Sequence, residues 1–562
     1  MIASTAPGSG SVVLPLPDLA HRRPVDVAEA LRDLPNLALL ESARQGAAAR
    51  WSYLAAGPLE VLEVPGSSAG GHALDGARRL LARMEAGPSD GADHGFPPFL
   101  GGLIGYLGYS FGSTLERRAR SRHPPTPMPD LWFGLYDRVI AWDHQAGRAW
   151  LGGRAVDGDR ARLGRRIAEF RARLEGVERS DGFVVSAGAP ADVPAATGRP
   201  ILPFTSSLER EAYEAAVGRV RAAIADGEIY QVNLTRRLAT PYRADPWPLY
   251  RRLRDGDPAV NAAYLALDLG SRATDGVHRG DTGPGGPGPR AIVSASPEGF
   301  VALDSRGRVT SRPIKGTRPR GQDHADDRRV ACELLQSGKD RAENVMIVDV
   351  VLNDLGRVCG PGTVAVPRLC RLERTDAVQH LVSTVTGRLR PGADAFDLLA
   401  AAFPGGSITG APKIRAMELI DAFEPVARGP YTGALGWIGP DGAMATSMLI
   451  RTFVADGATL SLHVGGGITW RSEPAAEWAE TVAKARGPLR AIGGVEIETG
   501  WGRWTAPEDA SGSQLTVGPG VDRPDDFDRP DDADAEDDTD LAEAGTLVRV
   551  PIAAGGPAWW RR

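Results

Sequence analysis

Residues 431–470 read YTGALGWIGPDGAMATSMLIRTFVADGATLSLHVGGGITW, and this stretch decides what kind of sheet the chain builds. Three runs rich in apolar and β-branched residues, 431–438, 444–454 and 459–470, are separated by Gly-Pro-Asp-Gly and by Asp-Gly. Connections of this kind are typical of tight turns between antiparallel strands. The stretch therefore predicts three successive antiparallel strands.

Helical and strand patterns alternate upstream of this stretch. Apolar residues recur at helical spacing within 207–226, and a strand pattern follows at 229–238. In that strand Gln231, Asn233 and Thr235 fall on one side. One face of the sheet should therefore be polar, as the wall of a cavity would be.

The size of the chain exceeds one ordinary hydrophobic core. It has 562 residues, of which 42% are apolar and 24% charged, so we expect several modules or one large composite domain. Composition divides it into an N-terminal region, 1–200, a motif-rich region, 201–494, and an extension, 495–562. The extension has too few apolar groups to offset the entropy of ordering, so we expect it to be disordered.

The acidity of the chain is concentrated in that extension. Between Asp522 and Glu543, twelve acidic residues face two arginines, a local charge of −10 that leaves +4 for the rest, since the total is −6. A faintly basic body without an arginine-aromatic stripe predicts no nucleic-acid partner, and no apolar run is long enough to predict a membrane span. Three irregularly spaced cysteines favour a reducing cytoplasm.

Two pairs of carboxylates are spaced so that each would share one helix face. Asp340 and Glu343 form one pair, and Glu477 and Glu480 the other. Four such oxygen donors would suit Mg²⁺ better than Zn²⁺, which prefers His and Cys. Either pair taken alone would equally fit a solvated helix face.

Four further features could carry chemistry. Lys315 follows a strand-like run and would become a nucleophile if burial lowered its pKa, but it equally fits an ordinary surface lysine. Glu298 could act as a general acid or base if partly desolvated, or be an exposed glutamate in a turn. The glycine-rich segment 403–423 leads into a helix start, where an anion could bind. Glycines 465–467 lie inside a strand, which indicates a close backbone approach or a bulge.

Taken together, the motifs in this chain are more specific than any one of them, and the chain resembles the chorismate-utilising enzymes. This family includes anthranilate synthase component I, aminodeoxychorismate synthase component I, and isochorismate and salicylate synthases. The resemblance rests on nine motifs in the second half of the chain, which are IYQVNLTRRL (229–238), SPEGF (296–300), RPIKGTRPRG (312–321), DRAENVMIVDVVLNDLGR (340–357), HLVSTVTGRL (380–389), FPGGSITGAPKIRAMELID (403–421), IRT (450–452), GGGIT (465–469) and EWAETVAKAR (477–486). NLALLESA (36–43), GGLIGYLGYSFG (101–112) and PDLWFGLYDRVIAWD (129–143) resemble the first half of the same enzymes.

The resemblance implies a fold and a set of roles. The fold would be α+β, a large sandwich of two antiparallel sheets with outer helices, like that of anthranilate synthase component I. Glu343 and Glu480 would bind Mg²⁺ directly, with Asp340 and Glu477 acting through water. The groups that hold chorismate or line its pocket would be Gln231, His380, Ser407, Tyr431, Arg451, Gly465, Gly466, Gly467 and Lys484.

Two positions indicate the branch of the family. Gln231 stands where the water-using synthases carry a lysine base, which implies an ammonia user. Lys315 in PIKGT (313–317) stands where anthranilate synthases typically have alanine, and it resembles the lysine of aminodeoxychorismate synthase. The implied activity is transfer of ammonia to chorismate, giving 4-amino-4-deoxychorismate for 4-aminobenzoate and folate synthesis. Lys315 would attack ring C2, and Glu298 would protonate the departing hydroxyl. The alternatives are anthranilate synthase component I and a non-catalytic regulatory homologue.

A partner and a second ligand also follow from the resemblance. None of the three cysteines has the setting of a glutaminase nucleophile, so ammonia should come from a separate glutaminase subunit or from solution. Ser42 belongs to the element that helps form a tryptophan pocket in related enzymes. Residues 261–264 replace the proline-containing part of that pocket, so Ser42 could instead have a structural role.

Overall fold

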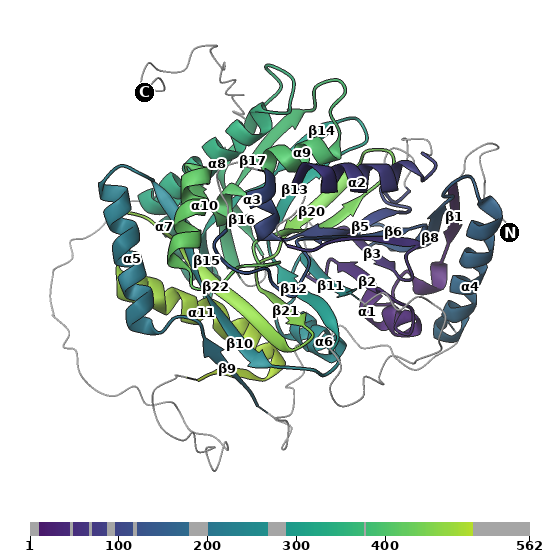
Figure 1. Cartoon of the computed structure of the whole chain (residues 1–562), viewed down its shortest axis with the longest axis horizontal. Helices are drawn as coiled ribbons and strands as arrows, with labels where there is room; N and C mark the ends of the chain where they lie inside the picture. Colours follow the sequence, from purple (N-terminus) through teal and green to yellow (C-terminus); the bar gives the residue numbers. More distant parts are fainter. Residues whose placement is uncertain are drawn as a thin grey trace.

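The computed structural model describes residues 11–44, 49–66, 70–86, 96–115, 121–178, 201–267, 288–375 and 378–497. Most of its strands form one large sheet and one smaller sheet (Figure 1). The large sheet runs in the order β1 (Ser11–Pro15), β8 (Arg148–Arg154), β7 (Arg138–Asp143), β3 (Trp51–Ala55), β2 (Ala38–Glu41), β11 (Asn261–Leu267), β12 (Arg290–Ser296), β21 (Thr452–Asp456), β22 (Thr459–Ile468), β10 (Gln231–Pro241), β9 (Leu202–Ser206) and β23 (Gly494–Glu496), with β18 (Gly410–Ala411) paired to β10.

The smaller sheet contains the strand that carries Lys315. It runs in the order β15 (Ile314–Pro319), β17 (Val378–Arg388), β14 (Arg308–Ser311), β13 (Gly299–Leu303), β20 (Met444–Met448), β19 (Ala434–Ile438), β5 (Gly102–Leu107), β6 (Leu131–Tyr136) and β4 (Glu60–Val64), with β16 (Ala365–Arg374) paired to β17. Among the described strands, pairing is antiparallel except between β23 and β9.

The predicted α+β fold with two antiparallel sheets is confirmed. Strands from before and after residue 200 pair with one another in both sheets: β2 with β11 in the large sheet, and β5 with β19 in the smaller one. The two regions therefore build one framework together. Apart from 495–497, the predicted extension lies outside the described residues.

The three-strand meander expected at 431–470 is wrong in one respect. Its middle run divides into β20 and β21, which lie in different sheets. The crossover runs through 449–451, and Arg451 there has a positive φ of 49°. The stretch is therefore two hairpins, β19–β20 and β21–β22, one in each sheet. Arg451 lies where the chain passes between the sheets.

Helices cover the outer faces of both sheets (Figure 1). α8 packs on β15 and β17 of the smaller sheet, while α11 and α6 pack on β22 and β12 of the large sheet. The α-helices are α1 (Pro24–Val27), α2 (Gly70–Ala82), α3 (Gly112–Leu115), α4 (Arg160–Glu178), α5 (Arg210–Ala225), α6 (Trp247–Gly256), α7 (His324–Gln336), α8 (Gly338–Gly356), α9 (Ala395–Ala402), α10 (Lys413–Phe423) and α11 (Pro474–Ile492). The 3-10 turns are η1 (Pro17–Leu19), η2 (Ala28–Leu31), η4 (Tyr109–Phe111) and η5 (Gly406–Ile408).

Aromatic side chains connect the two sheets. Phe99 stacks on Trp437 with ring centroids 4.9 Å apart, and Tyr53 meets both rings edge-on at 5.5 and 5.8 Å. Tyr53 comes from the large sheet and Trp437 from the smaller one, so the cluster joins the two layers. Each such pair contributes about 0.5–1.5 kcal/mol beyond the area that it buries.

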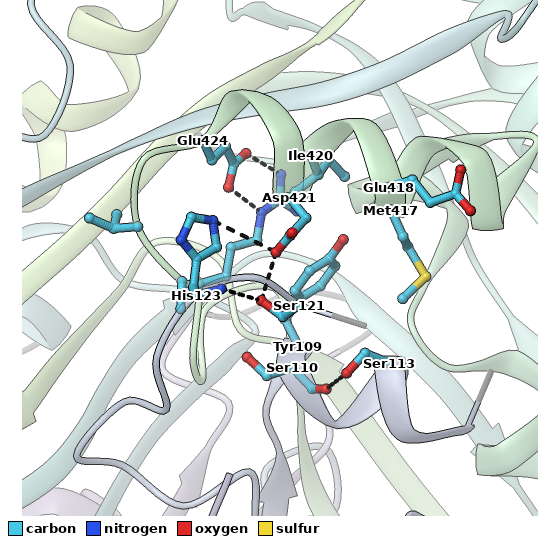
Figure 2. A pocket seen from close by; sticks show the side chains of 13 residues that line it. Tyr109, Ser110, Ser113, Ser121, His123, Met417, Glu418, Ile420, Asp421 and Glu424 are labelled. Carbon is cyan, nitrogen blue, oxygen red and sulfur yellow. Dashed lines mark hydrogen bonds and ion pairs between the residues drawn. The ribbon is translucent and has the colours of Figure 1, made fainter. Parts of the chain in front are cut away.

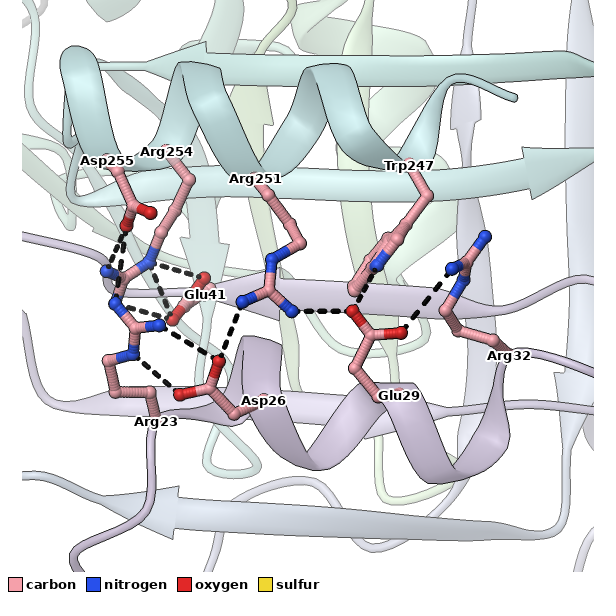
Figure 3. Close-up of polar contacts among 9 residues, drawn as sticks. All are labelled: Arg23, Asp26, Glu29, Arg32, Glu41, Trp247, Arg251, Arg254 and Asp255. Atoms are coloured by element: carbon pink, nitrogen blue, oxygen red, sulfur yellow. Dashed lines mark hydrogen bonds and ion pairs between the residues drawn. The ribbon is translucent and has the colours of Figure 1, made fainter. Parts of the chain in front are cut away.

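An ionic network joins the N-terminal turns to α6 (Figure 3). Arg254 pairs with Glu41 at the end of β2 at 3.0 Å, and Trp247 donates its indole N–H to Glu29 at 2.9 Å. Arg251 bridges Asp26 and Glu29. These contacts fix β2 and the following residue, Ser42. In the described part of the chain, no helix is both long and apolar enough to cross a bilayer.

Candidate functional site

Lys315 points into the protein from a bulge in β15. The pairing of β15 with β17 shifts register between Ile314 and Thr317, which takes Lys315 out of the regular ladder. Gly316 follows with a φ of +81°, and a Cβ there would lie 2.9 Å from Cβ of Asp340 on α8, so only glycine allows this approach. The Lys315 ammonium donates to the carbonyl oxygen of Ser407 at 3.2 Å. Burial lowers the pKa of Lys315, although Glu298 and Glu343 oppose the shift.

Glu298 is the buried acid beside this amine. It follows β12, is 8% exposed, and accepts the Ile314 backbone N–H at 3.5 Å. Burial raises the pKa of Glu298, while Lys315, the Ile314 amide and the Ser407 hydroxyl partly counter the rise. A carboxyl group in this environment tends to hold its proton, as a general acid must.

The glycine run 465–467 makes room for side chains of the site. In β22, Gly467, Gly466 and Gly465 pair with residues 233–235 of β10. A Cβ on Gly467 would lie 2.2 Å from the amide nitrogen of Gln231, which is 1% exposed and whose Oε1 has no hydrogen-bond partner. A Cβ on Gly466 would lie 3.1 Å from Glu477 Oε2 and 3.3 Å from Glu480 Oε1. The glycine run therefore allows the side chains of Gln231, Glu477 and Glu480 to approach the backbone of β22 closely. β22 pairs with β10 in regular register here, so the glycines do not form a bulge.

The four predicted carboxylates come from α8 and α11, and each lies close enough to another one for their charges to interact. Glu343 and Glu480 repel each other electrostatically across the site, and Glu477 adjoins Glu480. Burial raises the pKa of Glu343 and of Glu477. Burial would also raise the pKa of Glu480, but its ion pair with Lys484 at 2.7 Å lowers it. The fourth, Asp340, is bound by Arg318 at 2.8 Å.

The carboxylates on α8 and α11 fit a hard divalent cation. In the described ranges, no group of three or more His, Cys, Asp or Glu side chains is arranged so that it could hold a metal ion. Glu343 Oε1 is nevertheless buried without a hydrogen-bond partner, with only a 4.0 Å ion pair to Lys339, and Glu343 lies close enough to Glu480 for repulsion. A cation between Glu343 and Glu480 would give the Glu343 oxygen a partner and remove the repulsion between the two carboxylates. Mg²⁺ usually takes one or two carboxylates plus water and substrate oxygens.

Groups suited to substrate carboxylates lie on both sides of the crossover. Tyr431 is buried, and its ring packs against His463 with centroids 4.8 Å apart. The Arg451 side chain is half-exposed. Its ion pair with Asp257 is 3.7 Å long, which is longer than a hydrogen bond, so much of the guanidinium is free to bind a carboxylate. His380 on β17 contacts Thr317 Oγ1 at 2.8 Å, and burial, reinforced by Arg451 and Arg44, lowers its pKa to about 4.

Lys484 and Ser407 complete this set in different ways. The Lys484 ammonium donates to the Gly465 carbonyl at 2.8 Å while it pairs with Glu480. Ser407 in η5 offers its carbonyl to Lys315 and its hydroxyl to Glu298. In the segment 403–423, α10 begins at Lys413, which pairs with Asp354 at 2.7 Å.

Ser42 lies apart from these groups. Its hydroxyl donates to the Trp51 carbonyl at 3.0 Å and approaches the Val260 carbonyl at 3.3 Å. It lines a cavity of about 500 Å³ between the sheets, together with Tyr53 and the buried Arg154. The tryptophan pocket therefore stays a prediction, and the cavity beside Ser42 is where it would lie, apart from the groups around Lys315.

Sequence reasoning missed a buried ion pair behind the site. Arg428 and Glu424 are 1% and 3% exposed and lie 2.6 Å apart. They are four residues apart, and because α10 ends at Phe423 and Pro425 follows Glu424, the chain between them is not the helix for which this spacing would predict a contact. Glu424 and Tyr109 both line a pocket of about 140 Å³, and Figure 2 shows their side chains there.

Comparison with known proteins gives concordant matches. Residues 38–490 match the family described as chorismate binding enzyme. Anthranilate synthase component 1 of Streptomyces coelicolor is 39% identical over 461 residues, 81% of this chain and 83% of that protein. Aminodeoxychorismate synthase component 1 of Klebsiella aerogenes is 39% identical over 391 residues, 70% of this chain and 77% of the relative. The crystal structure of anthranilate synthase component I from Streptococcus pneumoniae TIGR4 has a TM-score of 0.64 at 27% identity, covering 79% of this chain and 93% of that one.

Proposed function

Because the chain belongs to the chorismate-binding enzyme family, we propose that it converts chorismate and ammonia to 4-amino-4-deoxychorismate, as an aminodeoxychorismate synthase component 1. The observation that carries this choice within the family is the inward-facing amine of Lys315 beside the buried acid Glu298. A lysine with a lowered pKa supplies a nucleophile, and an acid with a raised pKa supplies a proton.

The substrate would be held by its two carboxylates. Arg451, the Tyr431 hydroxyl and the Lys484 ammonium supply donors, and Gln231 closes the wall beside the glycine run. Mg²⁺ bound by Glu343 and Glu480 would neutralise the ring carboxylate. The proximity of Asp340 to Arg318 suits an outer, water-mediated role for that carboxylate.

The chemistry would proceed in two displacements. The neutral Lys315 amine forms a bond to ring C2, both ring double bonds shift (C1=C2 to C1=C6 and C5=C6 to C4=C5), and the C4–O bond breaks as Glu298 donates its proton, releasing water. Ammonia then bonds to C4, both double bonds shift back, and the C2–N bond breaks to free Lys315. The proton that the new amine loses returns to Glu298. Two easier steps replace one difficult displacement.

A separate subunit would supply the ammonia. Burial raises the pKa of Cys359 to about 11 and also raises that of Cys370, so both are held as unreactive thiols. Behind Glu298 lies a cavity of about 20 Å³, lined by apolar side chains from α8 such as Ile347 and Val351. Its volume suits one molecule of the size of water or ammonia.

The product assay tests this proposal. Purified protein is incubated with chorismate, ammonium chloride and MgCl₂, and products are separated and identified by mass and fluorescence. We expect 4-amino-4-deoxychorismate, which aminodeoxychorismate lyase converts to 4-aminobenzoate. Anthranilate as the main product, persisting in Lys315→Ala, would establish the second candidate, which the 39% identity to a Streptomyces coelicolor anthranilate synthase favours. Folded protein that leaves chorismate unchanged would instead be the non-catalytic homologue.

A further inference from the structure

Three segments that carry candidate site residues converge on the buried Arg428–Glu424 pair. Glu424 Oε1 accepts both the backbone N–H and the hydroxyl of Thr235 in β10, each at 2.9 Å. Arg428 Nη2 donates to the carbonyl of Asn233 in the same strand at 2.7 Å. Two residues before Asn233, this strand begins with Gln231.

The same guanidinium also holds the other two segments. Its Nη1 donates to the Ile408 carbonyl at 3.0 Å and approaches Thr432 Oγ1 at 3.4 Å. Ile408 follows Ser407, whose carbonyl receives the Lys315 ammonium. Thr432 has a positive φ of 59° and follows Tyr431.

All five N–H groups of Arg428 are engaged. Nε and one Nη2 hydrogen form a bidentate pair with the Glu424 carboxylate, and the other three serve Asn233, Ile408 and Thr432. A lysine has three donors and no planar fork, so it could not make the same set of contacts. The guanidinium also lies 4.7 Å from the centroid of Tyr109 and 5.9 Å from that of Tyr431.

We propose that Arg428 and Glu424 are positioning residues that set the mutual placement of Gln231, Ser407 and Tyr431. The inference rests on the proposed function, because it concerns the groups that hold chorismate and Lys315. Both residues are almost completely buried, so they act through the three segments that they bind.

The test compares Arg428→Lys with a matched variant of an equally buried pair, Arg138→Lys. Arg138 is 4% exposed, pairs with Asp137 at 2.8 Å and packs on Phe170 of α4. β7 and α4 carry none of the candidate site residues. Chorismate consumption, whatever the product, gives kcat and KM, and thermal unfolding gives Tm.

We expect Arg428→Lys to lower kcat/KM about a hundredfold, since a misplacement near 1 Å costs that much, with KM raised through Tyr431 and kcat lowered through Ser407 and Lys315. Arg138→Lys should stay within about threefold of wild type at a similar loss of Tm. Equal kinetic losses in the two variants, or an unchanged KM and kcat in Arg428→Lys, would overturn the inference.

A milder variant covers the case in which Arg428→Lys does not fold. Thr235→Val removes one hydrogen bond to Glu424 and keeps the shape of the side chain. It should raise KM about threefold to tenfold without a comparable change in Tm, in line with the loss of one charge-assisted hydrogen bond. An unchanged KM would contradict the inference. Wild-type protein that consumes no chorismate would instead refute the proposed function.

Discussion

Adding one methyl group at Gly466 should perturb the carboxylates of the site without disturbing the sheet. The new Cβ would lie 3.1 Å from Glu477 Oε2 and 3.3 Å from Glu480 Oε1, where ordinary contacts begin at 3.4 Å. Both neighbours are the ends of flexible side chains, which can move. The required shift is about 0.3 Å at Glu477 and about 0.1 Å at Glu480.

The kinetic effect follows from the size of this shift. A misplacement of about 1 Å costs roughly a hundredfold in rate, so a few tenths of an ångström should cost about threefold to tenfold in kcat/KM. Because Glu480 is a predicted Mg²⁺ ligand, the Mg²⁺ concentration for half-maximal activity should also rise. Tm should change little.

Two other glycines provide controls of opposite kind. A Cβ on Gly465 would lie 2.3 Å from the backbone carbonyl of Leu234, which cannot move freely, so Gly465→Ala should destabilise the fold by about 1–3 kcal/mol. Gly218 in α5 has open space at its Cβ, so Gly218→Ala should stabilise by up to about 1 kcal/mol and leave activity unchanged. Steady-state kinetics and calorimetry on the three glycine variants measure the change in kcat/KM and in Tm for each. A Gly466→Ala enzyme with wild-type kcat/KM and Mg²⁺ dependence would refute the reasoning.

Three further outcomes are expected. Lys315→Met should abolish turnover yet raise Tm, because burial lowers the pKa of Lys315 from 10.5 and its charged form therefore costs stability at pH 7; a lower Tm in calorimetry would contradict this. As pH falls from 6.5 towards 4, the free energy of unfolding in urea should fall by about 1–2 kcal/mol more for wild-type protein than for His380→Asn. The reason is that the folded protein lowers the pKa of His380 to about 4, so only the unfolded ring gains a proton in this window; parallel pH curves for the two proteins would argue against it. Iodoacetamide at pH 8 should modify the exposed Cys332 first, and rapid labelling of Cys359, whose pKa is raised to about 11, would show that burial to be wrong.

Local patterns predicted several parts of the fold well. The alternation in 229–238 became β10, and the two turn signals in 431–470, Gly-Pro-Asp-Gly and Asp-Gly, became real hairpin turns. The same pattern did not reveal that the run 444–454 changes sheets at Arg451, because alternation reports which face a residue occupies and not which sheet it joins. Pairing partners distant in sequence are set by tertiary packing.

The candidate site shows the same limit. The spacing of Glu477 and Glu480 predicted a shared helix face, and both do lie over Gly466. That Glu343, more than a hundred residues earlier in the chain, faces Glu480 came from resemblance and could not come from spacing. Arg428 was missed in part because two of its contacts go to the backbone carbonyls of Asn233 and Ile408, which leave no mark on side-chain patterns.

Burial separates two kinds of charged group in this protein. Lys315, Glu298 and Glu343 are buried with pKa values shifted against their charged forms, so each one costs stability in its ionised state. Arg428 and Glu424 are buried as a hydrogen-bonded pair, so the loss of either partner leaves an uncompensated charge. Substitution by apolar residues should therefore stabilise the fold at the first three positions and destabilise it at the last two, although all five changes should impair turnover. Opposite stability effects with the same kinetic direction are what distinguish groups that meet the substrate or its metal ion from groups that hold those groups in place.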